Sequence, residues 1–180
     1  MILLKNIQKA IKISPAKARQ DIQLLLSAAG YHDWDIGVCL TGNRNIRKLN
    51  REYRGKDKPT DILSFPFAEA VKPGKLPEPR SEDDKNLGDI FISIAYVQDW
   101  CKTNKVDIHD RLPILYAHGI CHLLGYDHQE DKDYYQMKQK EKRLLKKFER
   151  WTNALREEDK PEPVDRASNT PKGSSKPIEG

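Results

Sequence analysis

The sequence predicts one α/β (α+β) domain, in which a single small mixed β-sheet is packed with several helices. Two observations predict this class. Short strand-like segments, either apolar or alternating between apolar and polar residues, are interleaved with longer segments whose apolar residues recur at helical spacing. The length of 180 residues also suits one domain with a sizeable core.

The composition changes after residue 155. The remaining residues contain almost no large apolar side chains, so burial cannot offset the entropy lost on ordering them. We therefore predict a domain over residues 1–155 and a disordered C-terminal tail over residues 156–180. No apolar run in the sequence is long enough to cross a bilayer, so we expect no membrane partner.

The first half of the chain is expected to contain three strands and two helices. The strands are placed at residues 1–7, 35–41 and 61–65, and the helices at residues 15–29 and 43–53. Pro15 suits the first turn of a helix because its φ is already helical, and Gly30 suits the position after the last turn. Pro66 indicates that the third strand lies at a sheet edge or ends there.

The second half adds one strand and three helices. Residues 68–86 are rich in Pro, Gly and charge, and are expected to form a long exposed loop. A strand at residues 88–93 and a helix at residues 94–102 follow. Asp107 is placed to cap the next helix, and the last helix is expected to begin near Glu130. The predicted buried side of that last helix consists of Met137, Leu144, Leu145, Phe148 and Trp151.

Positive charge is the clearest feature of the composition. The formal net charge is +5 and the sequence pI is about 9.0, which favours an anionic partner such as nucleic acid. Residues 138–150 hold seven Lys or Arg against two Glu, a run typical of a solvated helix face or, alternatively, of an RNA-facing surface. The sequence has no Gly-rich phosphate loop and no dinucleotide fingerprint, so no nucleotide cofactor is expected.

The segment HGICHLLGYDH, residues 118–128, has the spacing of a metal site. On a helix, His118 and His122 lie on one face about a turn apart, where one ion can bridge their ring nitrogens. Gly125 tolerates a left-handed backbone, so the chain can reverse and deliver His128 to the same ion. The central helix and the turn after it are therefore predicted to hold one zinc ion. Three neutral ligands leave a fourth position open, as in catalytic zinc sites.

Two alternatives concern neighbouring residues of this segment. The spacing is also that of the metzincin peptidases, HExxHxxGxxH, but Gly119 stands where those enzymes carry their glutamate base. A peptidase mechanism therefore lacks its proton carrier. Cys121 is a conceivable fourth ligand, but its angular position on the helix is offset from the histidine face, and we expect a buried apolar role for it.

Three motifs together identify a resemblance. The histidine segment, NREYRGKDKPTDILSFPF at residues 50–67 and LGDIFIS at residues 87–93 resemble the YbeY family of metal-dependent endoribonucleases and ribosomal RNA maturation factors, over roughly residues 1–155. The resemblance implies hydrolysis of phosphodiester bonds in single-stranded RNA, in maturation of the 3′ end of small-subunit ribosomal RNA and in ribosome quality control. It also implies zinc on His118, His122 and His128.

The family's important arginine falls on Arg54. Its guanidinium stays charged and can hold phosphate oxygens bidentately, which suits it to stabilise charge on the phosphorane oxygens. Lys56 and Lys58 can add weaker attraction to flanking phosphates, although a solvated loop is the slightly favoured interpretation for both. Ser64 can bind substrate, or can serve only as a local hydrogen-bond partner at its strand end.

The nucleophile is expected to be a water bound to the metal at His118 and its partner ligands, since an open zinc site lowers the pKa of bound water toward 7. The proton acceptor is left open between that metal-bound hydroxide and Asp127. For Asp127 we favour the other interpretation, in which its carboxylate does not bind the metal itself but orients a side chain that does.

The resemblance also bears on partners and location. It suggests a small-subunit ribosomal protein and an Era-type GTPase as partners. Cys121 and the NLGDIF stretch look more like the animal proteins, which function in mitochondria, with a bacterial-type cytoplasm as the alternative. Two other functions stay in view: a ribosome-assembly factor in which zinc is only structural, and, ranked below it, a zinc metallopeptidase.

Overall fold

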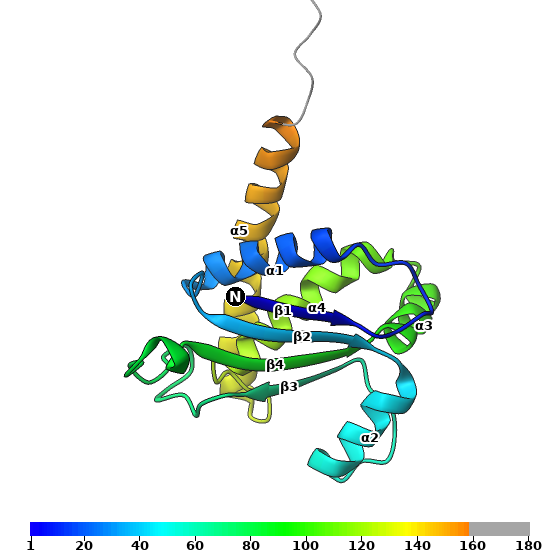
Figure 1. Ribbon diagram of the computed structural model, residues 1–180, viewed down its shortest axis with the longest axis horizontal. Coiled ribbons are helices and arrows are strands. Elements are labelled where there is room, and N and C mark those ends of the chain that lie inside the picture. The colour runs from blue at the N-terminus through cyan, green and yellow to red at the C-terminus, as the bar shows by residue number, and fades with distance from the viewer. Residues whose placement is uncertain (159–180) are drawn as a thin grey trace, which may run out of the picture.

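The structure is a computed structural model that describes residues 1–158 (Figure 1). It contains one four-stranded sheet, five α-helices and a short 3-10 helix within this range. In chain order the elements are β1 (Ile2–Asn6), α1 (Pro15–Ala29), β2 (Asp35–Thr41), α2 (Asn43–Arg54), β3 (Ile62–Pro66), η1 (Glu82–Asp84), β4 (Asn86–Ser93), α3 (Ile94–Asn104), α4 (Ile108–Leu123) and α5 (Asp131–Glu158).

The sheet is mixed, as predicted. Its strand order is β1-β2-β4-β3, with β1, β2 and β4 parallel and β3 antiparallel to β4. β3 is thus an edge strand, which is where Pro66 can be accommodated because one side of the strand needs no ladder hydrogen bonds. The pairing aligns Ile62 with Ile92 and Ser64 with Ile90, and so fixes which β3 side chains point toward the helices.

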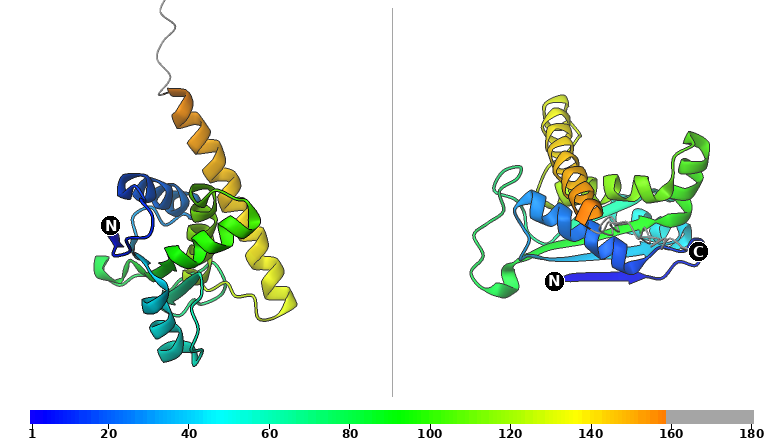
Figure 2. Two further views of the ribbon diagram at one scale, coloured as in Figure 1. Left: turned by 90° about the vertical axis from the view of Figure 1, so that its right-hand side faces the viewer. Right: turned by 90° about the horizontal axis from the view of Figure 1, so that it is seen from above.

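Helices cover one face of the sheet. α1, α4 and α5 lie together on that face, whereas α2 lies beside the end of the sheet near β3 and β4 (Figures 1 and 2). The covered face carries the buried residues of the two central strands: Ile36, Val38 and Leu40 of β2 and Ile90 and Ile92 of β4. The alternating residues Cys39, Asp89 and Phe91 point to the other face and are partly or fully exposed.

The ends of the helices follow their sequence signals. The Ser14 hydroxyl accepts a hydrogen bond from the Lys17 amide before Pro15, and Gly30 closes α1 with φ 88°. Asp107 caps α4 by accepting the His109 amide at 2.7 Å. The helix α5 runs to Glu158, three residues past the predicted domain end. The rest of the predicted tail lies outside the described residues.

The helix α4 packs against the sheet at Gly119. A Cβ atom added to Gly119 would lie 2.6 Å from the Ile90 Cδ1 atom and 3.2 Å from that of Ile62. A side chain at this position would face the sheet and would have to displace the ends of the Ile90 and Ile62 side chains. A glutamate here, as a metzincin carries, would meet apolar side chains, which argues against the peptidase alternative.

We predict that Gly119→Glu destabilises the protein strongly. The new carboxylate would be forced among apolar side chains without a partner, at a cost of several kcal/mol. The melting temperature should fall by roughly 10 °C or more in thermal unfolding followed by circular dichroism.

The matched control is Gly42→Glu. Gly42 has φ −113°, and a Cβ atom added there would meet no atom within 4 Å, so this variant should melt within about 2 °C of the parent. Equal melting temperatures for the two variants would contradict the close packing of α4 on the sheet.

Candidate metal centre and adjoining cleft

Three imidazole rings converge at the end of α4. The Nε2 atoms of His118 and His122 are 3.1 Å apart, and one ring nitrogen from each of His118, His122 and His128 lies within 4.8 Å of the others. Ligands around a tetrahedral ion with bonds of 2.0–2.1 Å are separated by about 3.3 Å. The three side chains therefore fit a metal ion, as their spacing in the sequence predicted.

The reversal at Gly125 brings the third ring to the site. Gly125 has φ 82°, and its amide bonds to the carbonyl of His122 at 3.0 Å while the Tyr126 amide bonds to that of Cys121 at 3.0 Å. A side chain at Gly125 would also collide with the Cβ atom of Ala70 in the long loop. Both observations explain why glycine stands at this position.

Burial keeps His122 in the form that a metal requires. It lowers the pKa of His122 from 6.5 to about 4, and repulsion from His118 and His128 acts in the same direction. The His122 ring is therefore neutral near pH 7 and offers a lone pair, which is the ligating form of imidazole.

Glu141 of α5 supports the first histidine. Its Oε1 atom lies 2.6 Å from the His118 Nδ1 atom, and its Oε2 atom accepts a hydrogen bond from the Lys138 ammonium at 3.1 Å. Burial alone would raise the pKa of Glu141, but the hydrogen bonds from His118 and Lys138 outweigh it and the pKa is lowered. The carboxylate thus fixes the proton on the Nδ1 atom of His118. The Nε2 atom of the same ring is left free to bind an ion where the three imidazole rings meet.

The role of Glu141 was not predicted from the sequence. This residue is one of only two acids in the basic run of residues 138–150, and such acids usually belong to a solvated face. A signal was present, because Glu141 lies four residues after Met137 and three before Leu144, on the side of the helix that was predicted to be buried. All three side chains are buried. A carboxylate on the apolar side of a helix needs a buried partner.

The histidines open onto a cleft of about 720 Å³ formed by β3, the end of α2 and the turn at residues 125–129. Arg54, Ser64 and Asp127 line this cleft, so three of the predicted site residues lie in it with the histidines. The Ser64 Oγ atom is buried and has no hydrogen-bond partner among residues 1–158.

Lys56 and Lys58 are placed differently. Both are exposed and neither lines the cleft. Gly55, with φ 66°, ends α2 and turns the chain, and the Asn50 side chain then holds the Lys58 carbonyl at 2.8 Å.

Two carboxylates line the cleft. Asp127 Oδ1 accepts the His128 amide at 2.7 Å, while Asp61 Oδ1 accepts the Ile62 amide at 2.8 Å. Among the described residues Asp127 makes no hydrogen bond to an imidazole, and the ring-orienting contact comes from Glu141 instead. Asp61 was not singled out by sequence analysis, because an acid just before a strand carries no distinctive pattern.

The comparisons with known proteins decide the family. The family model described as "Endoribonuclease YbeY" matches residues 3–149. The chain belongs to the YbeY family.

Members of the YbeY family from distant organisms are similar to most of the chain. A human Endoribonuclease YbeY is 41% identical over 151 residues, which cover 84% of this chain and 90% of the human one. A protein of the same name from Thermus thermophilus is 34% identical over 129 residues, covering 72% of this chain and 87% of its own length. The solution structure of a Thermotoga maritima protein superposes with a TM-score of 0.56 at 25% identity, covering 92% of this chain and all of that one.

Tyr53 and Phe65 form an aromatic wall of the cleft that sequence analysis also missed. Tyr53 is 67% exposed, and its ring meets the edge of Phe65 with centroids 4.9 Å apart. Phe65 in turn contacts Phe91 across β3 and β4 at 5.7 Å. The position of Tyr53 directly before Arg54 was the available signal, since aromatic and basic residues side by side are typical of surfaces that bind single-stranded nucleic acid.

Cys121 has the buried role that was expected. It is fully buried among the core residues, and burial raises the pKa of its thiol to about 12. Within residues 1–158, the group of side chains that could hold one ion consists of the three histidines and does not include Cys121. The three cysteines are free thiols.

We predict that Glu141→Gln weakens metal binding by about 10- to 100-fold. The amide keeps the size of the side chain but loses the charge that makes the His118 ring a better donor. Competition with a chromogenic chelator would measure the change.

Glu149→Gln is the matched control, because Glu149 is the other acid of the same basic run and is exposed. It removes the same charge and should leave metal affinity within about twofold of the parent. Equal losses in the two variants would show that only the net charge matters.

Proposed function

We propose that this protein is a zinc-dependent endoribonuclease that hydrolyses phosphodiester bonds in single-stranded RNA. The observation that carries the proposal is the cleft that Arg54 and Ser64 line beside the three-histidine site. Membership of the YbeY family, whose matched members are named as endoribonucleases, supports the same activity.

Zinc is the proposed ion, and one ion is the proposed number. Three imidazole nitrogens suit zinc, and three protein ligands leave a coordination position for substrate or solvent. When bound, zinc supplies a Lewis acid that polarises a phosphodiester and acidifies water. The chain contributes the neutral His122 ring and the His118 ring that Glu141 orients.

Arg54 is proposed to hold the non-bridging oxygens of the scissile phosphate. A guanidinium can bind two of them at once and remains charged throughout the reaction. The Ser64 hydroxyl is proposed to donate to a substrate oxygen after its side chain rotates, because its Oγ atom is buried in this structure and has no partner within residues 1–158. Lys56 and Lys58, exposed beyond Gly55, are proposed to attract phosphates that flank the cleft.

Proton transfer is proposed to involve the cleft carboxylates. Asp127 stands next to His128, and one of its oxygens is held by the His128 amide, which fixes the orientation of the carboxylate. We propose that it takes a proton from a water in the cleft, with Asp61 as a second carboxylate that lines the same cleft.

The preference for single strands is proposed to come from Tyr53 and Phe65. Bases of a single strand are free to stack on aromatic side chains, whereas bases in a duplex are already stacked on each other. The exposure of the Tyr53 ring beside Arg54 would let one base stack while its phosphate is held.

The biological substrate is proposed to be small-subunit ribosomal RNA at its 3′ end, in rRNA maturation and ribosome quality control. A small-subunit ribosomal protein and an Era-type GTPase are the proposed partners, and the mitochondrion is the proposed location. The 41% identity to the human relative supports this placement. None of the helices within residues 1–158 has both the length and the apolar character needed to cross a membrane.

We predict that His118→Ala and Arg54→Ala each lower kcat/KM for a single-stranded RNA by at least about 100-fold. The first removes a metal ligand and the second removes the group that balances phosphate charge. A fluorescent oligoribonucleotide assay with added zinc would measure both, with circular dichroism to check folding.

His109→Ala and Arg150→Ala are the controls, because both residues are exposed and neither lines the cleft. They should retain cleavage within about twofold. Full cleavage by His118→Ala and Arg54→Ala would overturn the proposed enzyme. If instead a folded His118→Ala protein restores rRNA maturation in cells that lack the protein, zinc has a structural role and the chain is an assembly factor.

Tyr53→Ala should raise the KM for single-stranded RNA by roughly 5- to 150-fold, because base stacking on an aromatic ring contributes about 1–3 kcal/mol. Tyr53→Phe keeps the ring and should behave like the parent. Tyr135→Ala, which removes a 65% exposed tyrosine from α5, is the control for nonspecific loss of aromatic surface. Equal KM values for Tyr53→Ala and the parent would contradict a stacking role.

A further inference from the structure

Positive charge is concentrated on a second short segment, apart from the basic run of α5 at residues 138–150. Residues 43–58, which comprise α2 and the turn after it, contain seven Lys or Arg and two acids, a formal charge of +5. The whole chain of 180 residues has the same formal charge. Each of the two basic segments, residues 43–58 and residues 138–150, thus carries as much net positive charge as the whole chain.

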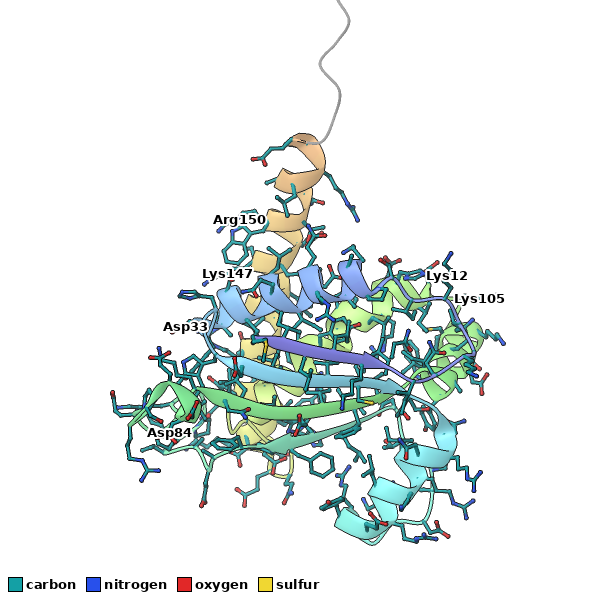
Figure 3. All side chains as sticks on the ribbon, in the orientation of Figure 1. Lys12, Asp33, Asp84, Lys105, Lys147 and Arg150 are labelled. Carbon is teal, nitrogen blue, oxygen red and sulfur yellow. The ribbon has the colours of Figure 1, made fainter. Side chains whose placement is uncertain are left out.

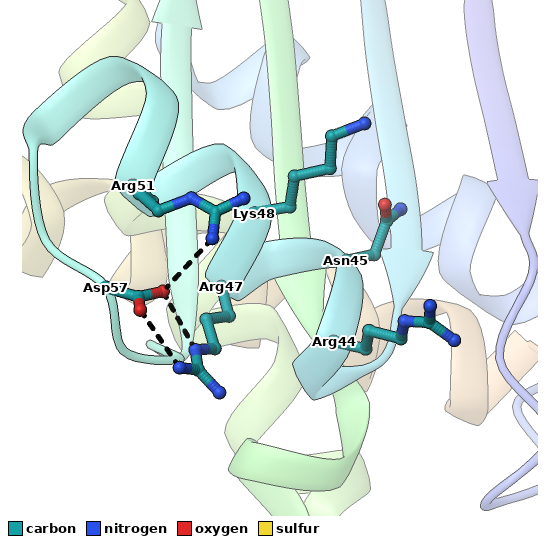
Figure 4. Close-up of a pocket in the computed structure, with 6 residues that line it drawn as sticks. All are labelled: Arg44, Asn45, Arg47, Lys48, Arg51 and Asp57. Carbon is teal, nitrogen blue, oxygen red and sulfur yellow. Dashed lines mark hydrogen bonds and ion pairs between the residues drawn. The ribbon is translucent and has the colours of Figure 1, made fainter.

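Four of these cations form one surface, which we call the α2 basic face: Arg44, Arg47, Lys48 and Arg51. Their spacing of three and four residues places them on one side of the helix. Together with Asn45 and Asp57 they line a hollow of about 620 Å³ (Figure 4). The hollow is separate from the cleft at the histidines, and the two share no lining residue.

One carboxylate organises part of this surface. Arg47 donates to Asp57 through two nitrogens, at 2.9 and 3.0 Å, and the Arg51 guanidinium lies 3.8 Å from the same carboxylate. Figure 4 shows both arginines directed at Asp57, whereas Arg44 and Lys48 extend away from it. Within residues 1–158, Lys48 has one ion pair, with Glu52 at 3.9 Å. Two acids therefore face four cations, and positive charge remains.

Packing of the fold does not account for these cations. The buried residues of α2 are Ile46 and Asn50, which lie on another side of the helix. The Arg47, Lys48 and Arg51 side chains are 55%, 64% and 59% exposed. Like charges three or four residues apart destabilise a helix, so the arrangement costs stability in the free protein. A polyanion bound along the helix would remove that repulsion.

The α2 basic face leads into the cleft. Arg54 lies three residues after Arg51 and seven after Arg47, at the edge of the same side of the helix, and it lines the cleft. From Arg44 to Arg54 the helix rises roughly 15 Å. A stacked nucleic acid strand places about four phosphates along that length. The row of cations is thus long enough to contact several consecutive phosphates of one strand. This arrangement suits a nucleic acid better than a single anion.

We propose that the α2 basic face is a second RNA-binding site, which holds the backbone of the same strand that enters the cleft. It takes the phosphates on one side of the scissile bond, without reading bases, and Arg54 is the point where the two sites meet. The identity of the ligand as RNA rests on the proposed function. Binding of a single-stranded polyphosphate backbone to this helix does not depend on catalysis.

The test is the salt dependence of binding by the full chain. Fluorescence anisotropy would measure the affinity for a labelled oligodeoxythymidylate of about 20 nucleotides. The salt concentration would be varied between roughly 0.05 and 1 M, because the release of counterions from the phosphates makes the affinity depend on salt. The variant combines Arg44→Gln, Lys48→Gln and Arg51→Gln and leaves the Arg47–Asp57 pair intact. Each lost phosphate contact lowers the slope of log K against log salt by about 0.7, so the slope should become shallower by about 2.

The control variant combines Lys142→Gln, Lys146→Gln and Arg150→Gln. These exposed cations lie on α5, and Figure 3 places Arg150 well away from α2. The control removes the same charge from a helix, and its slope should change by less than half as much. Equal changes in both variants, or an unchanged slope for the α2 variant, would overturn the proposal. Melting temperatures check that each variant is folded.

Failure of the second binding site can be distinguished from failure of the proposed endoribonuclease activity. If the parent protein binds the oligonucleotide with the predicted slope but cleaves no RNA, the endoribonuclease fails and the binding site stands. If it cleaves RNA and the α2 variant cleaves a substrate of the same length as well as the parent at low substrate concentration, the second site fails and the enzyme stands.

Discussion

The contact on which the site depends is the 2.6 Å pair between the His118 Nδ1 atom and the Glu141 carboxylate. Glu141 is only 7% exposed, and an ionised carboxylate at that depth is stable only when it is paired and hydrogen-bonded. The pair satisfies the carboxylate and fixes the His118 ring at the same time. It also joins α5 to α4, so the last helix of the domain is part of the metal centre and not only a cover for the core.

Much of the fold could be predicted from periodicity and end signals. The strand at Asp35–Thr41 and the helix at Pro15–Ala29 have the predicted bounds, because alternation and caps are local properties of the sequence. The order β1-β2-β4-β3 was not predicted, since strand pairing is decided by tertiary packing. The histidine trio could be predicted because a helical repeat and a glycine turn determine its geometry over only eleven residues.

The rest of the site depends on contacts between distant segments. Glu141 lies 23 residues from His118, and its role appears only when α5 packs on α4. The cleft wall made by Tyr53 and Phe65 depends in the same way on the end of α2 meeting β3. Lys56 and Lys58 were grouped with Arg54 because they are near in sequence, but the turn at Gly55 separates them from the cleft.

The central claim is that three imidazoles bind a metal ion and leave one coordination position free. X-ray absorption spectroscopy at the zinc edge of the zinc-loaded protein tests it most directly. The account predicts three imidazole nitrogens and one further light atom at about 2.0–2.1 Å, and no sulfur. A sulfur shell near roughly 2.3 Å, or a fourth imidazole in place of the light atom, would contradict it.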